Sequence, residues 1–113
     1  MPKRGDFLAL PGSPISPEAQ VHGGSAIGRG AVVAAGAVVN GAVVFDGARI
    51  SAGAHVVNSI VGVGAVIGAG TVLHGAVIGD GAVIGSGNEL LTGVRVWPDA
   101  RLADGSVRFS SDG

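Results

Sequence analysis

Histidine and aspartate are the residues of this chain whose side chains could do chemistry. A neutral histidine can act as a general base, and sets of histidines can hold zinc. The histidines are far apart in the sequence, so any joint action depends on how the chain folds between them. They are His22, His55 and His74.

The aspartates fit turns better than catalysis. Asp46, Asp80 and Asp104 each precede a glycine, and Asp-Gly pairs are typical of turns. Cysteine is absent, which excludes disulfides and thiolate metal sites. Segments such as GVGAVIG match loose phosphate-loop patterns, but they belong to a six-residue repeat that runs through the chain. The sequence therefore predicts no catalytic residue, no cofactor-binding residue and no metal ligand here.

Length and composition limit the remaining classes. The chain has 113 residues, the size of one domain, and a net charge of −1. It lacks the basic stripe that nucleic-acid binding requires. No apolar run approaches the roughly 20 residues of a membrane span, and no apolar signal-peptide core follows Met1. We therefore expect a cytoplasmic protein that binds neither nucleic acid nor membrane.

The dominant feature is a repeat. Aliphatic residues recur at spacings of six, interrupted by three spacings of five that lie 17 residues apart. Three such rungs per 17 or 18 residues indicate a coil with three flat sides, which is the pattern of a parallel β-helix. We predict an all-β fold, a single-stranded parallel β-helix of about five triangular coils built from hexapeptide repeats. The rung residues are Val21, Ile27, Val33, Val39, Val44, Ile50, Val56, Val61, Ile67, Leu73, Ile78, Ile84, Leu90, Val96 and Leu102.

Strand alternation fixes which other residues face inward. The residue two before each rung should share its face, and most of these residues are small, so the interior should be a narrow prism. Asn88 falls on such a position near Thr71, and we expect an internal hydrogen-bond ladder toward Ser106 rather than a ligand site. In the short rungs the missing residue is assigned to the corner, which places Ala42, Ser59 and Ala76 inside.

The same alternation places the histidines outside. His22 and His74 follow a rung residue and His55 precedes one, so all three are predicted to be solvated. The outward positions beside the short rungs are apolar instead. A contiguous exposed apolar patch favours an interface with another copy or a second domain. The candidate interface residues are Val43, Phe45, Ile60, Val77 and Trp97.

Both ends depart from the repeat. Residues 1–20 contain four prolines and are predicted to form a leader or linker, with residues 21–107 as the β-helix and 108–113 as a tail. The terminal coils need caps. At the start, the leader either packs on the open first coil or is unstructured. The bulky residues that could serve as caps are Phe7, Leu8 and Leu10 at the start, and Trp97, Pro98, Arg108 and Phe109 at the end.

Three segments carry a family resemblance: VFDGARI (44–50), HGAVIGDGAVIG (74–85) and NELLTGVRVWPDARLADGSVRFSSD (88–112). They resemble the C-terminal domain of bacterial sugar-nucleotide pyrophosphorylases, most closely the mannose-1-phosphate guanylyltransferase (GDP-mannose pyrophosphorylase) type. The likeness covers roughly residues 6–112, and its ending is the specific part, because many transferases share hexapeptides. It implies a left-handed β-helix, a hand that periodicity does not show.

The resemblance also implies a function. In that family a separate N-terminal α/β domain joins a nucleoside triphosphate to a sugar 1-phosphate with Mg²⁺, using a Gly-rich loop that nothing in this sequence matches. It therefore implies no cofactor in this chain, with Mg²⁺ only in a catalytic domain outside it. The chain is expected to be inactive alone and to serve oligomerisation or interdomain contact in GDP-mannose synthesis. Its expected partner is another copy or a nucleotidyltransferase catalytic domain.

Two other functions remain open. A small trimeric hexapeptide acyltransferase would need an intersubunit histidine and usually a protruding loop, which the unbroken register from Val21 to Leu102 does not contain. A purely structural β-helix is the other alternative.

Overall fold

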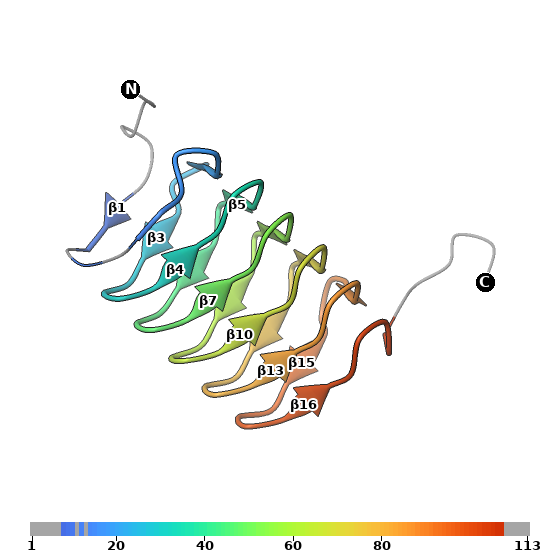
Figure 1. The fold of residues 1–113 in the computed structure, drawn as a ribbon. Coiled ribbons are helices and arrows are strands. Elements are labelled where there is room, and N and C mark those ends of the chain that lie inside the picture. Colours follow the sequence, from blue (N-terminus) through green and yellow to red (C-terminus); the bar gives the residue numbers. More distant parts are fainter. Residues whose placement is uncertain (1–7, 11, 13, 108–113) are drawn as a thin grey trace.

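The computed structural model describes residues 8–10, 12 and 14–107. Within these residues the chain forms sixteen short strands and no helix. The strands lie in three parallel sheets that form the three sides of a left-handed β-helix of about five coils, stacked along one axis (Figure 1). The predicted fold class is confirmed.

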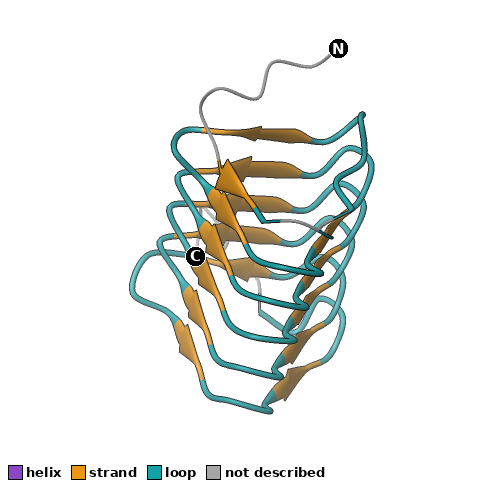
Figure 2. Ribbon diagram, turned by 90° about the vertical axis from the view of Figure 1, so that its left-hand side faces the viewer, coloured by secondary structure: helices purple, strands orange, loops and turns teal. Residues whose placement is uncertain are grey.

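From β2 onward, each sheet takes every third strand of the chain, because each coil places one strand on each side, and β1 adds to the sheet of β3 (Figure 2). Sheet A consists of β1 (Leu8–Ala9), β3 (Ala26–Ile27), β6 (Val43–Val44), β9 (Ile60–Val61), β12 (Val77–Ile78) and β15 (Arg95–Val96). Sheet B consists of β4 (Val32–Val33), β7 (Arg49–Ile50), β10 (Val66–Ile67), β13 (Val83–Ile84) and β16 (Arg101–Leu102). Sheet C consists of β2 (Gln20–His22), β5 (Val38–Asn40), β8 (His55–Val57), β11 (Val72–His74) and β14 (Glu89–Leu90).

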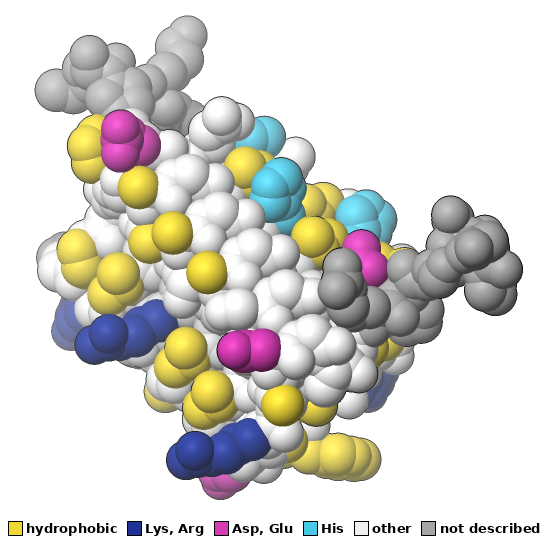
Figure 3. Space-filling view, turned by 45° about the vertical axis from the view of Figure 1, so that its right-hand side comes forward, with side chains coloured by type: hydrophobic (Ala, Val, Ile, Leu, Met, Phe, Trp, Pro, Cys, Tyr) yellow, Lys and Arg dark blue, Asp and Glu magenta, His cyan; other side chains and the backbone are white. Residues whose placement is uncertain are grey.

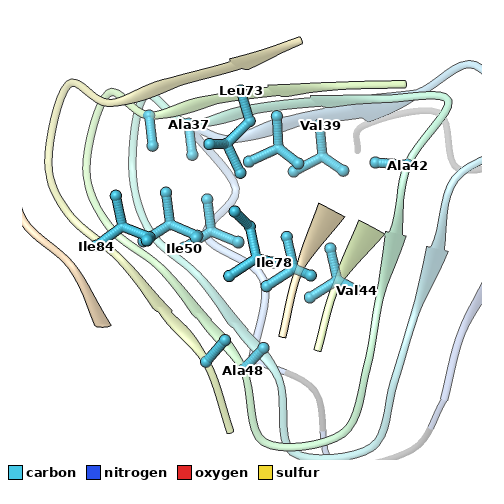
Figure 4. Close-up of a cluster of buried hydrophobic side chains, with 14 of the residues drawn as sticks. Ala37, Val39, Ala42, Val44, Ala48, Ile50, Leu73, Ile78 and Ile84 are labelled. Carbon is cyan, nitrogen blue, oxygen red and sulfur yellow. The ribbon is translucent and has the colours of Figure 1, made fainter. Parts of the chain in front are cut away.

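The rung residues fill the interior. Ile67 stacks between Ile50 and Ile84 in register, and all three are at most 1% exposed. Figure 4 shows these side chains converging from the three sides with alanines at the edges. Burying an aliphatic side chain is worth about 1.5–3 kcal/mol, so each coil contributes three such residues to a continuous core.

The short rungs turn in a single residue. Gly41, Asn58 and Gly75 occupy these corners with φ of 63°, 48° and 71°, a region that glycine and asparagine tolerate better than other residues. Because the corner absorbs the missing residue, Ala42 and Ser59 return to the interior at 1% and 2% exposure, as predicted.

Pairing begins upstream of residue 21. β1 pairs in parallel with β3, and Ile15 forms a bridge to Val33, so this part of the leader adds to the first coil. Leu10 continues the pairing through its backbone N–H, which donates to the carbonyl of Ile27 at 2.9 Å. Phe7 and the proposed tail, residues 108–113, lie outside the described residues.

Candidate interaction surface

Sheet A presents an apolar outer surface. Val43, Ile60 and Val77 are partners in adjacent strands and form one continuous column. Their side chains are 38–42% exposed, although each flanks a fully buried rung residue. The alternation that fills the interior therefore also lines up these side chains in water, as predicted.

A second column runs beside the first on the same sheet. Its members follow the inward residue of each strand, and the backbone N–H of all but the last donates to the next coil at 2.7–2.9 Å. Phe45 and Trp97 are its aromatic members, with 45% and 80% of their surfaces exposed. Trp97 therefore does not provide the end cap that its size suggested. We call this the outer column; it consists of Leu10, Gly28, Phe45, Gly62, Gly79 and Trp97.

The outer column contains a hollow near its N-terminal end. Gly28 lacks a side chain between Leu10 and Phe45, and a depression of about 190 Å³ opens there. Ala26 and Val43 provide further apolar walls. The sequence did not reveal this hollow, because it depends on how residues 8–10 pair with β3. The sequence also missed Leu10 and Val63 as exposed apolar residues, at 39% and 48%.

Exposed apolar side chains gather on this side of the molecule. Leu91, on the side of sheet C, is the only exposed large hydrophobic residue of the described chain that lies away from sheet A and the corner after it. Sheet B carries two exposed arginines among its outward positions, Arg49 and Arg101, and sheet A carries one, Arg95, on its last strand. Figure 3 shows the mixture of arginines and apolar side chains on the molecular surface.

The corner aspartates have a structural role. Asp46 accepts a hydrogen bond from the backbone N–H of Arg29 in the preceding coil, at 2.9 Å, and Asp80 does the same for Val63. Asp104 caps Ser86 in this way at 2.8 Å. The turn role predicted for these residues is confirmed, with the acceptor bonding across coils.

The histidines all lie on sheet C. His55 and His74 are exposed, in adjacent strands β8 and β11 but offset by two residues. His22, on β2, is half-buried rather than fully solvated. All three occupy the outward positions that the alternation predicted, and Figure 3 shows them on one side of the molecule. Among residues 8–10, 12 and 14–107, no three histidine or acidic side chains come together in a metal-binding arrangement.

Asn88 is fully buried and bonded as predicted. Its side-chain amide donates to the carbonyls of Gly85 and Ala103 at 2.9 and 3.0 Å. Its Oδ1 accepts from the backbone N–H of Val107 at 2.7 Å and from the Ser106 hydroxyl at 3.3 Å. All its hydrogen-bonding capacity is used inside the coil, so this position offers nothing to a ligand.

Residues 4–107 match the sequence profile of the family described as GMPPB C-terminal domain. The chain belongs to this family. The match covers almost the whole chain and confirms the resemblance seen in the sequence. No curated protein sequence is detectably similar to this GMPPB C-terminal domain family member.

Solved structures share its fold. GDP-perosamine N-acetyltransferase from Caulobacter crescentus, solved as a point mutant with CoA and GDP-perosamine, matches at a TM-score of 0.70 and 25% identity over 92% of this chain and 49% of that one. The acetyltransferase domain of PglB from Neisseria gonorrhoeae, in complex with acetyl coenzyme A, matches at 0.65 and 23% identity over 86% and 54%. This GMPPB C-terminal domain family member thus spans about half the length of these structures. In the described part of the chain, no helical segment has the length and apolarity that crossing a bilayer requires.

Proposed function

We propose that this chain is the β-helical domain of a nucleotidyltransferase of the mannose-1-phosphate guanylyltransferase type, and that it holds subunits or domains together during GDP-mannose synthesis in the cytoplasm. The match of residues 4–107 to the GMPPB C-terminal domain family carries this proposal. Catalysis and its Mg²⁺ belong to a separate catalytic domain.

Two structural observations support a contact role. The interior is filled by rung residues such as Ile67 and Leu73, both 0% exposed, so a small molecule finds no room inside the coil. The outside, in contrast, carries a continuous apolar surface on sheet A. Such surfaces on soluble proteins mark interaction sites.

The test is an assay of GDP-mannose formation from GTP and mannose 1-phosphate with Mg²⁺. We expect no turnover from the purified chain, and a complex when it is mixed with the mannose-1-phosphate guanylyltransferase catalytic domain encoded nearest in the same genome. Turnover by the chain alone would refute the proposal, and so would failure to associate both with that domain and with itself.

Paired substitutions locate the surface. Phe45→Asp with Ile60→Asp places two charges on sheet A and should abolish association, measured by light scattering. Val66→Asp with Val83→Asp is the matched control on sheet B and should leave association intact, because both positions also face outward. Equal effects of the two pairs would contradict a role for sheet A.

The alternative is an acyltransferase, which the shared fold of two acetyltransferase structures favours. It predicts that the chain binds acetyl coenzyme A and releases free thiol in the presence of an amino sugar. Calorimetry with acetyl coenzyme A distinguishes the two functions, since the contact role predicts no heat of binding.

A further inference from the structure

In the outer column of sheet A, the aromatic side chains and the glycines lie at positions that a two-fold rotation would set against one another. Counted from the hollow, successive members of the column lie one coil, or about 4.8 Å, apart. These members are Gly28, Phe45, Gly62, Gly79 and Trp97. The first, third and fourth members are glycines, while the second and fifth are aromatic. We call a glycine position a gap and a protruding aromatic side chain a knob. The order along the column is then gap, knob, gap, gap, knob.

We propose that sheet A binds sheet A of a second copy, with the two β-helices antiparallel and the two-fold axis running along β9. The inference rests on the contact role proposed above and specifies its partner. The axis places Ile60 opposite itself in the second copy. It also places Trp97 opposite Gly28, and Phe45 opposite Gly79, so both aromatic knobs of each copy meet gaps of the other.

The position of the hollow is the reason to place the two copies antiparallel. It lies at the N-terminal end of sheet A, lined by Leu10, Gly28 and Phe45, whereas Trp97 projects from the C-terminal end with 80% of its surface exposed. Only an antiparallel arrangement brings these two ends together. An isologous contact of this kind repeats the insertion at both ends, because residue i meets j and j meets i.

A parallel arrangement fits less well. A two-fold axis in the interface, parallel to the β-helix axis and running between the two columns, would set each coil against the same coil of the second copy. Phe45 would then lie against the column of Val43 rather than against a gap, and the hollow would face Ala26 and stay unfilled. The placement of the two aromatic residues therefore selects the antiparallel register.

The glycines have a second reason to be there. A Cβ at Gly28 would lie 2.5 Å from Asp46 Oδ1, and one at Gly79 would lie 2.5 Å from the backbone nitrogen of Pro98. Stacking of the coils thus demands these gaps. What it does not demand is that Phe45 and Trp97 stand at the two positions that fill them by symmetry.

The first column fits the same axis. Val43 comes to lie opposite Val77 and Ile60 opposite Ile60, so the centre of the contact is wholly aliphatic. Arg95 falls at the rim opposite Ala26, where its guanidinium keeps contact with water. Apolar centres with charged rims are typical of protein interfaces.

The size of the surface sets the affinity. The axis along β9 sets five strands of sheet A, β3 to β15, against those of the second copy, because β1 has no strand opposite it. These five strands occupy about 24 Å along the β-helix axis, and each side is roughly 18 Å wide, so the contact would bury about 900 Å² in total. This is near the lower limit of specific interfaces, and we expect a dissociation constant on the order of micromolar. The register also sets Asp46 against Asp80 at the rim, so added salt should tighten the dimer.

Cross-linking tests the register directly, because the chain has no cysteine of its own. Packed sheets lie about 10 Å apart, beyond the reach of a disulfide, so the probe is a short bis-maleimide. Ile60→Cys should cross-link with itself. Val43→Cys and Val77→Cys should cross-link as a mixture and at least fivefold less when alone, because each is displaced about 9.6 Å from its own copy. Val66→Cys on sheet B is the matched control and should stay uncross-linked.

Trp97→Ala tests the knob. Trp97 is largely exposed, so its removal should leave the circular dichroism and urea midpoint unchanged. The dissociation constant measured by sedimentation equilibrium should rise about 30-fold, as for a buried interface tryptophan.

Each other outcome overturns the inference. Self-cross-linking of Val43→Cys as strong as that of Ile60→Cys would show parallel copies, and cross-linking of Val66→Cys would show random encounter. An unchanged dissociation constant for Trp97→Ala would exclude the knob. If the wild-type chain stays monomeric at millimolar concentration yet binds the catalytic domain, the inference falls and the proposed function stands.

Discussion

Replacing Asn88 by alanine should release the last coil while leaving the others folded. The Asn88 side chain makes four hydrogen bonds, two of them to the carbonyls of Gly85 and Ala103 and two from residues 106 and 107. Gly85 keeps a second partner, because the Thr71 hydroxyl also donates to its carbonyl at 2.7 Å. Among the described residues, the N–H of Val107 loses its side-chain acceptor, whereas the Ala103 carbonyl keeps the backbone N–H of Ser106 at 3.2 Å.

The expected loss follows from these contacts. Each intramolecular hydrogen bond contributes about 0.5–1.5 kcal/mol, and water can replace some of them because Ser106 is exposed and Val107 is half-buried. We therefore expect Asn88→Ala to lower the free energy of unfolding by about 2–3 kcal/mol. Asn88→Asp should cost at least as much at neutral pH, since it keeps the volume but sets a carboxylate against two carbonyl oxygens.

The assay is urea unfolding followed by circular dichroism, combined with amide hydrogen exchange. In a stacked repeat each coil contacts only its neighbours, so protection should fall in β14, β15 and β16 but persist around β5 and β8. Because β15 adjoins Trp97, the same variant should also weaken self-association. Ser51→Ala removes a hydroxyl from an outward position and should change stability by less than about 0.5 kcal/mol. A loss for Asn88→Ala as small as that would refute the idea that the ladder secures the last coil.

Four further substitutions test the stacking itself by urea unfolding. Gly62→Ala should cost roughly 3 kcal/mol, because its Cβ would lie 2.5 Å from Asp80 Oδ1, whereas Gly64→Ala, with φ of 68° and open space, should cost only about 1–2 kcal/mol of backbone strain. Asp80→Ala removes the bond to the Val63 N–H and should cost about 1 kcal/mol. Ile67→Ala leaves a cavity at a fully buried site and should cost about 3–4 kcal/mol.

Specific results would contradict each of these predictions. If Gly62→Ala were no worse than Gly64→Ala, the close approach of successive coils would not explain the glycine. If Asp80→Ala were neutral, the corner aspartate would have no role beyond solubility. Tolerance of Ile67→Ala would mean that the interior is loosely packed.

The interior could be predicted because its rules are local. A spacing of six and the two-residue alternation of a strand fix which residues face inward, and the five-residue rungs differ only at a corner such as Asn58. Ser59 was correctly placed inside on that basis. The left hand of the coil followed from family resemblance, because periodicity is the same for either hand.

The surface was less predictable, because it depends on neighbours from different coils. That Phe45 and Trp97 face water on one side follows from alternation, and this was foreseen. The hollow between Leu10 and Phe45 was not, because residues 8–10 lie outside the repeat and only the pairing of β1 with β3 brings them beside Gly28. A pattern along the sequence does not reveal a depression that forms between residues of different coils.

A filled interior leaves only the outer surface for function, and the three sheets are not equal. Sheet B places Arg49 and Arg101 among its outward residues, and sheet C places its histidines there. Contact between apolar surfaces requires water to leave both, and charged or polar side chains resist that step. Outward positions in the strands of sheet A carry no charged side chain until its last strand, β15, so little desolvation of charge is needed there. The Arg95 side chain of β15 can remain in water. A domain that acts by association should therefore use sheet A first, and the exposed Trp97 at its far end is the residue on which the proposed antiparallel register depends.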